Sequence, residues 1–210
     1  MSVPHREPVV FVVDDDEAVR NSLRLLLKSI GMPAVAYASA EEFLAGYDDE
    51  QPGCIVLDVR MPGMSGPELQ GELNRRGALI PVIFITGHGD VPMAVEAMRH
   101  GAVDFMQKPF SDKDLVSRIQ LAMAADRRNR EAIGAKDQIH ARIAALTPRE
   151  RQVLDLVTQG KSNKVIAGDL GASQRTVEIH RSHVMEKMGA TSLAQLVRMT
   201  MIAGISTTTY

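Results

Sequence analysis

Short apolar runs alternate with helix-like patterns over the first half of the chain. The runs are rich in Val, Ile and other strand-forming residues, and each is followed by a segment with helical periodicity. This alternation predicts a parallel sheet covered by helices on both faces, an α/β fold. The predicted strands cover residues 9–13, 34–38, 54–57, 82–85 and 103–106.

The helical segments carry recognisable boundary residues. After the first strand, apolar residues recur on one helical face, and Gly31 falls where that helix should end. Ser39 and Glu42 have the spacing of a capping box, and Ser111 is placed to cap the fifth helix. From residue 115 a charged, Ala-rich helical pattern continues to about residue 145 and is weakened by Gly134. We interpret it as the end of the fifth helix followed by a solvated helical linker.

After residue 146 the pattern predicts helices alone. Thr147 and Glu150 form a second capping-box pattern around Pro148. Helices are predicted over residues 148–159, 163–170, 174–188 and 192–203. The predicted organisation is therefore α/β plus all-α, with domains at 1–125 and 146–210 and a linker at 126–145.

Composition and charge narrow the possible functions. The 210 residues carry a net charge of −2, but residues 1–125 carry a net −7 and residues 146–210 a net +3. This asymmetry indicates that a polyanionic partner would bind the C-terminal part. The single cysteine, Cys54, excludes an intrachain disulfide, fits a reducing cytoplasm and should pack as a small buried hydrophobe. The apolar runs are too short to span a membrane, and the N-terminus lacks the pattern of a signal peptide.

Polar residues follow the predicted strands where their carboxyl ends should meet. Asp14 and Asp15 follow the first strand, Asp58 the third, Thr86 the fourth and Lys108 the fifth. In a doubly wound sheet, ligands bind at this edge, near the point where strand order reverses. These residue types suit phosphoryl chemistry. Carboxylates hold Mg²⁺, an aspartate can form an acyl phosphate, and an ammonium or a hydroxyl can contact phosphate oxygens.

The acidic stretch has two simpler explanations. Acidic residues after a strand often form a solvated loop or a helix N-cap, and a single Thr or Lys at a strand end often has no function. The joint pattern at four strand ends favours a shared phosphoryl site.

Residues 8–125 resemble a response-regulator receiver domain. The stretches "VVDDD", "CIVLDVRMPGMSG", "VIFITGHGDVPMAVEAM" and "GAVDFMQKPF" carry the resemblance in order and spacing. It implies a flavodoxin-like (βα)5 fold with Asp58 as the phosphoacceptor. It also implies Mg²⁺ held by Asp14, Asp15, Asp58 and the Arg60 backbone carbonyl, and phosphoryl contacts from Thr86 and Lys108.

Three further positions follow from the same resemblance. Phe105 falls at the aromatic switch position, where many receivers carry Tyr, so its ring packing is kept but a hydroxyl hydrogen bond is lost. Arg60 and His88 lie two residues beyond Asp58 and Thr86, at positions thought to tune the lifetime of the phosphoryl group. Both could equally be ordinary polar loop residues.

The C-terminal segment has the pattern of a helix-turn-helix. On its second helix Val177, Val184 and Met188 share one face and should be buried. In such a motif the second helix enters the major groove, while Lys, Arg, Ser and Thr contact phosphates. A small helical packing domain with ordinary surface charge is the alternative. The predicted DNA-binding residues are Lys161, Lys164, Ser173, Arg175, Thr176, Glu178, Ile179, Ser182 and Lys187.

The segment from "LTPRERQVL" to "TSLAQLV" is similar to the LuxR/NarL-type four-helix DNA-binding domain. Glu178 and Ser182 stand where some NarL-type relatives carry lysines, so base preferences are not transferable. With the receiver in front, residues 8–205 resemble the FixJ/NarL (LuxR-type) family of response regulators, the FixJ branch most of all. The resemblance implies a cytoplasmic transcription regulator, not an enzyme, that acts as an activator.

That family implies a definite set of partners. A sensor histidine kinase passes a phosphoryl group to Asp58, the surface around residues 91–105 is remodelled, and the chain dimerises and binds promoter DNA beside RNA polymerase. One alternative is a haloacid-dehalogenase-like phosphatase, but the second acid that this class needs is replaced by Arg60. The other is a constitutive DNA-binding protein that uses its receiver only to dimerise.

Overall fold

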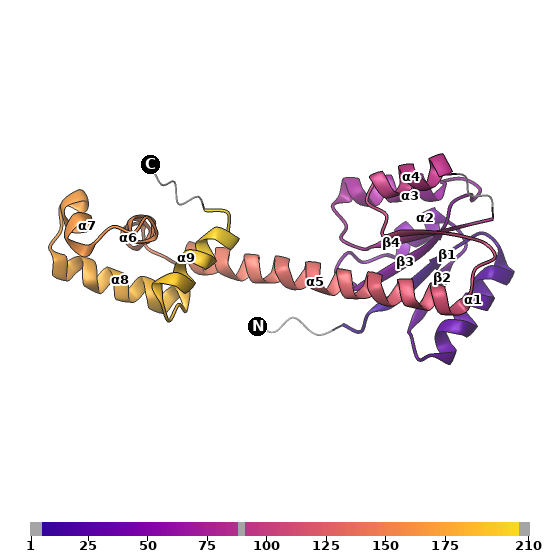
Figure 1. Ribbon diagram of the computed structural model, residues 1–210, viewed down its shortest axis with the longest axis horizontal. Helices are drawn as coiled ribbons and strands as arrows, with labels where there is room; N and C mark the ends of the chain where they lie inside the picture. The colour runs from indigo at the N-terminus through magenta and orange to yellow at the C-terminus, as the bar shows by residue number, and fades with distance from the viewer. Residues whose placement is uncertain (1–5, 88–90, 206–210) are drawn as a thin grey trace. The chain divides into compact units, whose positions relative to one another are not determined.

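The computed structural model describes residues 6–87 and 91–205, and the chain divides into two compact units between Arg130 and Glu131 (Figure 1). Five parallel strands form one sheet in the described part of the first unit, in the order β2-β1-β3-β4-β5. The strands are β1 Val9–Val13, β2 Ala34–Tyr37, β3 Gly53–Asp58, β4 Val82–Thr86 and β5 Asp104–Gln107. Both the parallel sheet and the flavodoxin-like order agree with the prediction.

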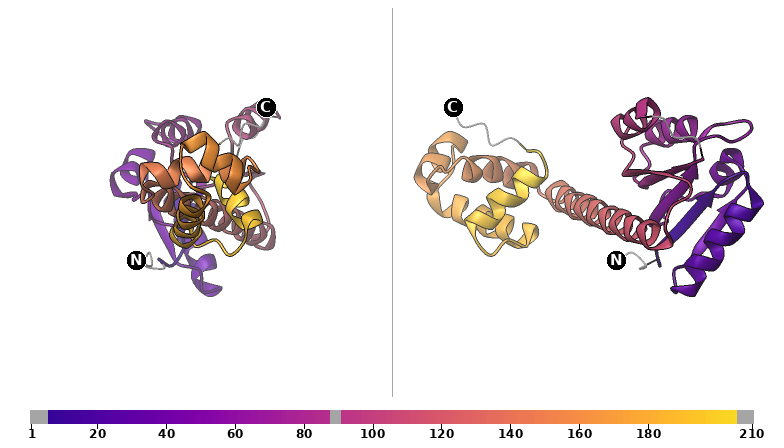
Figure 2. Two further views of the ribbon diagram at one scale, coloured as in Figure 1. Left: turned by 90° about the vertical axis from the view of Figure 1, so that its left-hand side faces the viewer. Right: turned by 45° about the vertical axis from the view of Figure 1, so that its right-hand side comes forward.

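Helices cover both faces of this sheet. Leu27 of α1 (Glu17–Ser29) and Ile119 of α5 (Asp112–Ala144) pack into the core on one face. Phe43 of α2 (Ala40–Gly46), Leu69 of α3 (Gly66–Arg76) and Ala97 of α4 (Val91–Arg99) pack into the core on the other. Figure 2 shows α1 and α4 on opposite sides of the strands. Because both faces are covered, the central strands β1, β3 and β4 are apolar along almost their whole length.

No predicted strand boundary differs from the observed one by more than one residue. Strand β3 begins at Gly53, where φ is +154° and an added Cβ would lie 1.9 Å from the Val9 carbonyl oxygen. Glycine is required there because β1 and β3 approach closely. The helix start at Ser39 also differs in detail. Ser39 caps α2 as expected, but the Glu42 carboxylate accepts the Ala38 N–H instead of closing the capping box on Ser39.

Helix α5 continues without a break from Asp112 to Ala144, although Gly134 lies within it. The predicted helical linker, residues 126–145, is helical as far as Ala144, but it is not solvated along its whole length. Asp126 is buried against the first unit, and Ile139 and Ile143 are buried in the core of the second. Packing at both ends outweighs the helix penalty of a single glycine, about 1 kcal/mol. The domain boundaries at 125/126 and 145/146 stay predictions.

The second unit contains, beside the end of α5, helices α6 Pro148–Thr158, α7 Asn163–Leu170, α8 Gln174–Met188 and α9 Leu193–Ile202. Thr147 and Glu150 form the expected capping box at α6. Gly171 and Gly189 end α7 and α8 in the left-handed conformation. The 33-residue α5 is long enough to cross a bilayer but too polar to do so. Each other helix of the described residues is too short or too polar to cross one.

Candidate functional site

The polar residues predicted from the strand ends do meet at the carboxyl edge of the sheet. Asp14 follows β1, Asp58 ends β3, Thr86 ends β4 and Lys108 follows β5. The residues Asp14, Asp58 and Thr86 are buried, at 1%, 7% and 1% exposure. Strands β1 and β3 are neighbours although β2 separates them in sequence, so this edge is the topological switch point at which ligands bind in doubly wound sheets.

Lys108 bridges the two buried aspartates. Its Nζ donates to Asp14 Oδ2 at 2.7 Å and to Asp58 Oδ1 at 2.8 Å. The remaining oxygens accept backbone hydrogen bonds, Asp14 Oδ1 from Asp16 at 2.9 Å and Asp58 Oδ2 from Arg60 at 2.7 Å. Each of the four carboxylate oxygens therefore has a donor, which is what allows two acidic side chains to lie side by side in a buried place.

Burial and pairing shift the ionisation of these groups in a consistent way. Burial raises the pKa of Asp14, and the hydrogen bond from Lys108 offsets only part of this rise. Burial by itself would lower the pKa of Lys108, but the hydrogen bonds to Asp14 and Asp58 outweigh it, so this pKa lies above its ordinary value. Lys108 is therefore a stable cation in the site, and the carboxylate of Asp14 is held there at a free-energy cost.

We expect Asp14→Asn to increase the free energy of unfolding of the metal-free protein at pH 7, by about 1 kcal/mol. Because the folded-state pKa of Asp14 is raised, stability is lost as pH rises through that pKa, and the amide has no such loss. Lys108 keeps Asp58 as its partner in the variant. Urea unfolding at pH 5 and pH 8 measures the effect, with a larger gain expected at pH 8. A loss of stability at both pH values would contradict the prediction.

The predicted Mg²⁺ ligands are of the right chemical type but are not assembled as a finished metal site. Asp15 is exposed, and within residues 6–87 and 91–205 no three acidic, His or Cys side chains are grouped closely enough to hold a metal ion. Asp16 serves as the N-cap of α1, so the simpler explanation holds for this one acid. The donor set of carboxylates and a backbone carbonyl still fits a hard cation.

Arg20 contributes to this site although the sequence did not single it out. Its Nη1 donates to the backbone carbonyls of Asp14 at 2.8 Å and Asp15 at 2.9 Å. It therefore fixes the backbone of the acidic loop without pairing with the carboxylates of Asp14 and Asp15. The available signal in the sequence for this role was the position of Arg20 on the first helix, four residues after the cap Asp16.

The two predicted switch residues lie on neighbouring strands. Thr86 is buried at the end of β4, and its carbonyl accepts the Lys108 N–H at 2.7 Å. Phe105 is half-buried on β5, with its ring centroid 6.5 Å from that of Phe84. The proposed tuning residue Arg60 is exposed, and His88 lies outside the described residues.

The helix-turn-helix prediction agrees with the burial of α8. Val177, Val184 and Met188 are at most 1% exposed and form part of the second unit's core. The opposite side of the helix is exposed, and its Ile179, at 49% exposure, is a large apolar residue without a core role. This exposed side carries Arg175, Glu178, Ile179 and Ser182.

Four of the other predicted DNA contacts already have partners within the protein. Lys187 Nζ donates to the buried Glu150 Oε2 at 2.7 Å, and Lys161 Nζ donates to Asp169 at 2.7 Å. Ser173 is the N-cap of α8, and its hydroxyl lies 2.8 Å from that of Thr176. The side chain of Lys164 is exposed on α7.

Glu150 connects α6 to α8. The hydrogen bond from Lys187, with that from the Thr147 backbone N–H, lowers the pKa of Glu150 to about 2. His183 of α8 also approaches it, with Nδ1 3.7 Å from Oε1. The "TPRE" pattern identified Glu150 as a cap, but its second role as an anchor for α8 depends on contacts that local sequence does not show.

A buried acid of the first unit was also missed. Asp126, at 1% exposure, accepts the Gly53 N–H at 3.0 Å and pairs with Arg130 at 2.9 Å. Arg130 further donates to the carbonyls of Asp49 and Gln51. The i, i+4 spacing of Asp126 and Arg130 was the only local signal.

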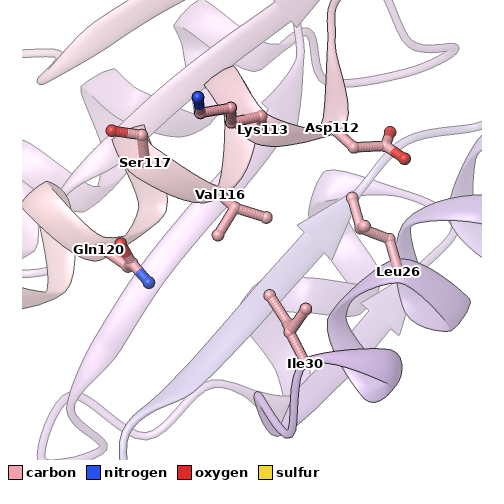
Figure 3. Close-up of a pocket in the computed structure, with 7 residues that line it drawn as sticks. All are labelled: Leu26, Ile30, Asp112, Lys113, Val116, Ser117 and Gln120. Carbon is pink, nitrogen blue, oxygen red and sulfur yellow. The ribbon is translucent and has the colours of Figure 1, made fainter.

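A hollow of about 440 Å³ lies between α1 and α5 (Figure 3). Leu26 of α1 and Ile30, which caps the C-terminus of α1, face Val116 of α5 across it. None of the predicted phosphoryl-site residues lines it. The remaining lining residues are Asp112, Lys113, Ser117 and Gln120.

The chain matches two known families, one in each unit. Residues 10–120 match the family described as response regulator receiver domain, and residues 144–200 match the family described as bacterial regulatory proteins, luxR family. Each match covers the unit in which the corresponding site was predicted.

Similar proteins combine both parts. The chain is 50% identical over 197 residues to the transcriptional regulatory protein FixJ of Azorhizobium caulinodans, covering 94% of this chain and 93% of that protein. It is 48% identical over 198 residues to nodulation protein W of Bradyrhizobium diazoefficiens, covering 94% and 87%. The solved structure of the response regulator StyR has a TM-score of 0.86 at 46% identity, covering 93% of this chain and 98% of that chain. The chain therefore belongs to the FixJ/NarL (LuxR-type) family of transcriptional response regulators.

Proposed function

We propose that this protein is switched by transfer of a phosphoryl group to Asp58 and that the switched form binds promoter DNA as a dimer. The observation that carries the proposal is the Lys108 ammonium held between the carboxylates of Asp14 and Asp58 at the switch point of the sheet. A paired acid, a buried hydroxyl and a cation at one edge are the groups that an aspartyl phosphate requires.

The roles of the site residues follow from their positions. An Asp58 carboxylate oxygen attacks the phosphorus of a phosphorylated histidine on a sensor kinase, a P–O bond forms, and the P–N bond to the kinase breaks. Asp14, Asp15, Asp58 and the Arg60 carbonyl would hold Mg²⁺, which supplies the positive charge that offsets the incoming phosphoryl oxygens. Lys108 is within reach of Asp58 and exchanges part of its carboxylate pairing for a phosphoryl oxygen.

The change then passes to the neighbouring strands. Thr86 donates its hydroxyl to the new group, and the Phe105 ring repacks toward the space beside it. The movement changes the surface formed by residues 91–105. Two receivers associate through this surface. The new group carries close to two negative charges, which is sufficient to reorganise a buried site of this size.

The C-terminal unit binds double-stranded DNA through α8 in the major groove. Glu178, Ile179 and Ser182 face the base edges, and Arg175 with Lys164 contacts phosphates. Ser173 and Thr176 contact the backbone beside them. Lys161 and Lys187 form ion pairs with Asp169 and Glu150, so their first role is to stabilise the unit itself, and any contact with DNA comes second.

The wider function follows the same family pattern. The Azorhizobium relative is named a transcriptional regulatory protein, and we infer for this chain a cytoplasmic activator that acts with a sensor kinase and RNA polymerase. It has no substrate to turn over beyond its own phosphoryl group. The position where a phosphatase of the haloacid-dehalogenase type carries its second acid is occupied by Arg60.

DNA binding with and without a phosphoryl donor tests the proposal. We expect acetyl phosphate with Mg²⁺ to shift the full-length chain from monomer to dimer and to increase its affinity for a selected duplex about a hundredfold, which requires about 2.7 kcal/mol of coupling. Sedimentation velocity and fluorescence anisotropy measure the two effects. Tight DNA binding that is indifferent to the donor would instead support the constitutive alternative.

A further inference from the structure

The last turns of α5 are part of the DNA-binding unit. Ile139 and Ile143 are 7% and 4% exposed and belong to the same buried cluster as Val184 and Met188 of α8. Their spacing of four residues places both on one face of α5. The segment predicted as linker therefore contributes a packed helix to the unit that carries the helix-turn-helix.

Arg142, next to Ile143, reaches the C-terminal end of α8. Its Nη1 donates to the Met188 carbonyl oxygen at 2.8 Å. Met188 is the final residue of α8, and the last carbonyls of a helix have no partner within the helix itself. A guanidinium in this place both satisfies a partly buried carbonyl and carries the charge that a helix C-terminus favours.

The turn after α8 is shaped around this contact. Gly189 has φ of +64°, and its N–H and that of Ala190 bond to the Glu186 and Met185 carbonyls. An added Cβ at Gly189 would lie 2.9 Å from Arg142 Nη1. The backbone of the turn satisfies two of the terminal carbonyls, and Arg142 satisfies that of Met188.

We propose that Arg142 is a positioning residue for DNA binding, which fixes the C-terminal end of α8 and joins it to the linker helix. The inference rests on the proposed function of α8 in DNA binding. Ser173 fixes the N-terminal end of α8 and the Lys187–Glu150 pair fixes its side against α6. Arg142 adds a polar anchor from α5 to the packing of Ile139 and Ile143, so a change in the last turns of α5 reaches the C-terminal end of α8 through it.

Full-length Arg142→Met and Arg142→Lys test this role. The probe is a duplex selected from a random-sequence pool by the wild-type chain phosphorylated with acetyl phosphate. We expect Arg142→Met to weaken binding about tenfold, and Arg142→Lys, which keeps a charged donor, to recover most of the loss. Amide hydrogen exchange should become faster in the last turn of α8 in the Met variant. Lys136→Met, at an exposed position on the same helix, removes the same charge and should leave affinity and exchange unchanged.

Salt titration separates positioning from direct phosphate contact. An internal anchor leaves the slope of log Kd against log salt unchanged, whereas loss of a phosphate contact reduces it by about one. The inference is overturned if the slope falls in this way, if Arg142→Met binds like the wild type, or if Arg142→Lys is as weak as Arg142→Met while both melt as the wild type does. Failure of the wild type to select any duplex would instead overturn the proposed function.

Discussion

Asp58→Asn should abolish phosphorylation of this protein by acetyl phosphate and Mg²⁺. The amide has no anionic oxygen to attack phosphorus. Intact-protein mass spectrometry should show a phosphate-sized gain in the wild type and none in the variant. Donor-dependent dimerisation and DNA binding should be lost with it.

A second variant makes this result specific to the pocket. Asp137→Asn makes the same chemical change at an exposed position on α5 and should be phosphorylated like the wild type. The fold of Asp58→Asn should persist because Lys108 keeps Asp14 as its partner. A mass gain that survived in Asp58→Asn would place the acceptor on another residue, and peptide mapping would then identify it.

Lys108→Met should destabilise the metal-free first unit by about 2 kcal/mol. The substitution removes the ammonium that bridges Asp14 and Asp58, so two buried carboxylates face each other with one donor fewer each. Removal of one partner of a fully buried pair costs about 3–5 kcal/mol. Because the Lys108 side chain is 24% exposed, water replaces part of what is lost.

The pH dependence of this loss identifies its cause. Burial already raises the pKa of Asp14, and without Lys108 that pKa rises further. A group with a raised folded-state pKa loses stability as pH rises, so the deficit of Lys108→Met should be larger at pH 8 than at pH 5. Urea unfolding at the two pH values measures it, and the added substitution Asp14→Asn should recover much of the loss at pH 8. A deficit that is independent of pH and unaffected by Asp14→Asn would show that Lys108 acts through packing.

Much of the local structure was predictable because local chemistry determines it. Strand β1 and helices α7 and α8 begin and end at the residues that the sequence pattern predicts, and Ser162 and Ser173 cap the two helices. Parallel strands bring their carboxyl ends to one edge, so the meeting of Asp14, Asp58 and Lys108 followed from strand order and the family resemblance. The capping box of Thr147 and Glu150 needs only four consecutive residues, and it formed as expected.

Tertiary structure decided which partner each charge takes. Lys161 and Lys187 are of a residue type that often contacts phosphates. In the structure they instead donate to Asp169 and Glu150, which lie 8 and 37 residues away in sequence. The contact of Arg142 with the Met188 carbonyl spans 46 residues. No periodicity or spacing encodes such pairs, because they depend on how separate helices pack.

The same distinction explains the linker. By itself the sequence determined that residues 126–145 are helical and charged, since both properties are local. Only the tertiary structure decided that Asp126, at one end of this segment, accepts the Gly53 N–H. It likewise decided that Ile139 and Ile143, near the other end, are buried in the core of the second unit. Burial of a few side chains against distant segments fixes both ends of residues 126–145, and the average charge of this segment does not reveal it. The sequence thus determined the elements and the acidic site, and the packing determined which residues hold them in place.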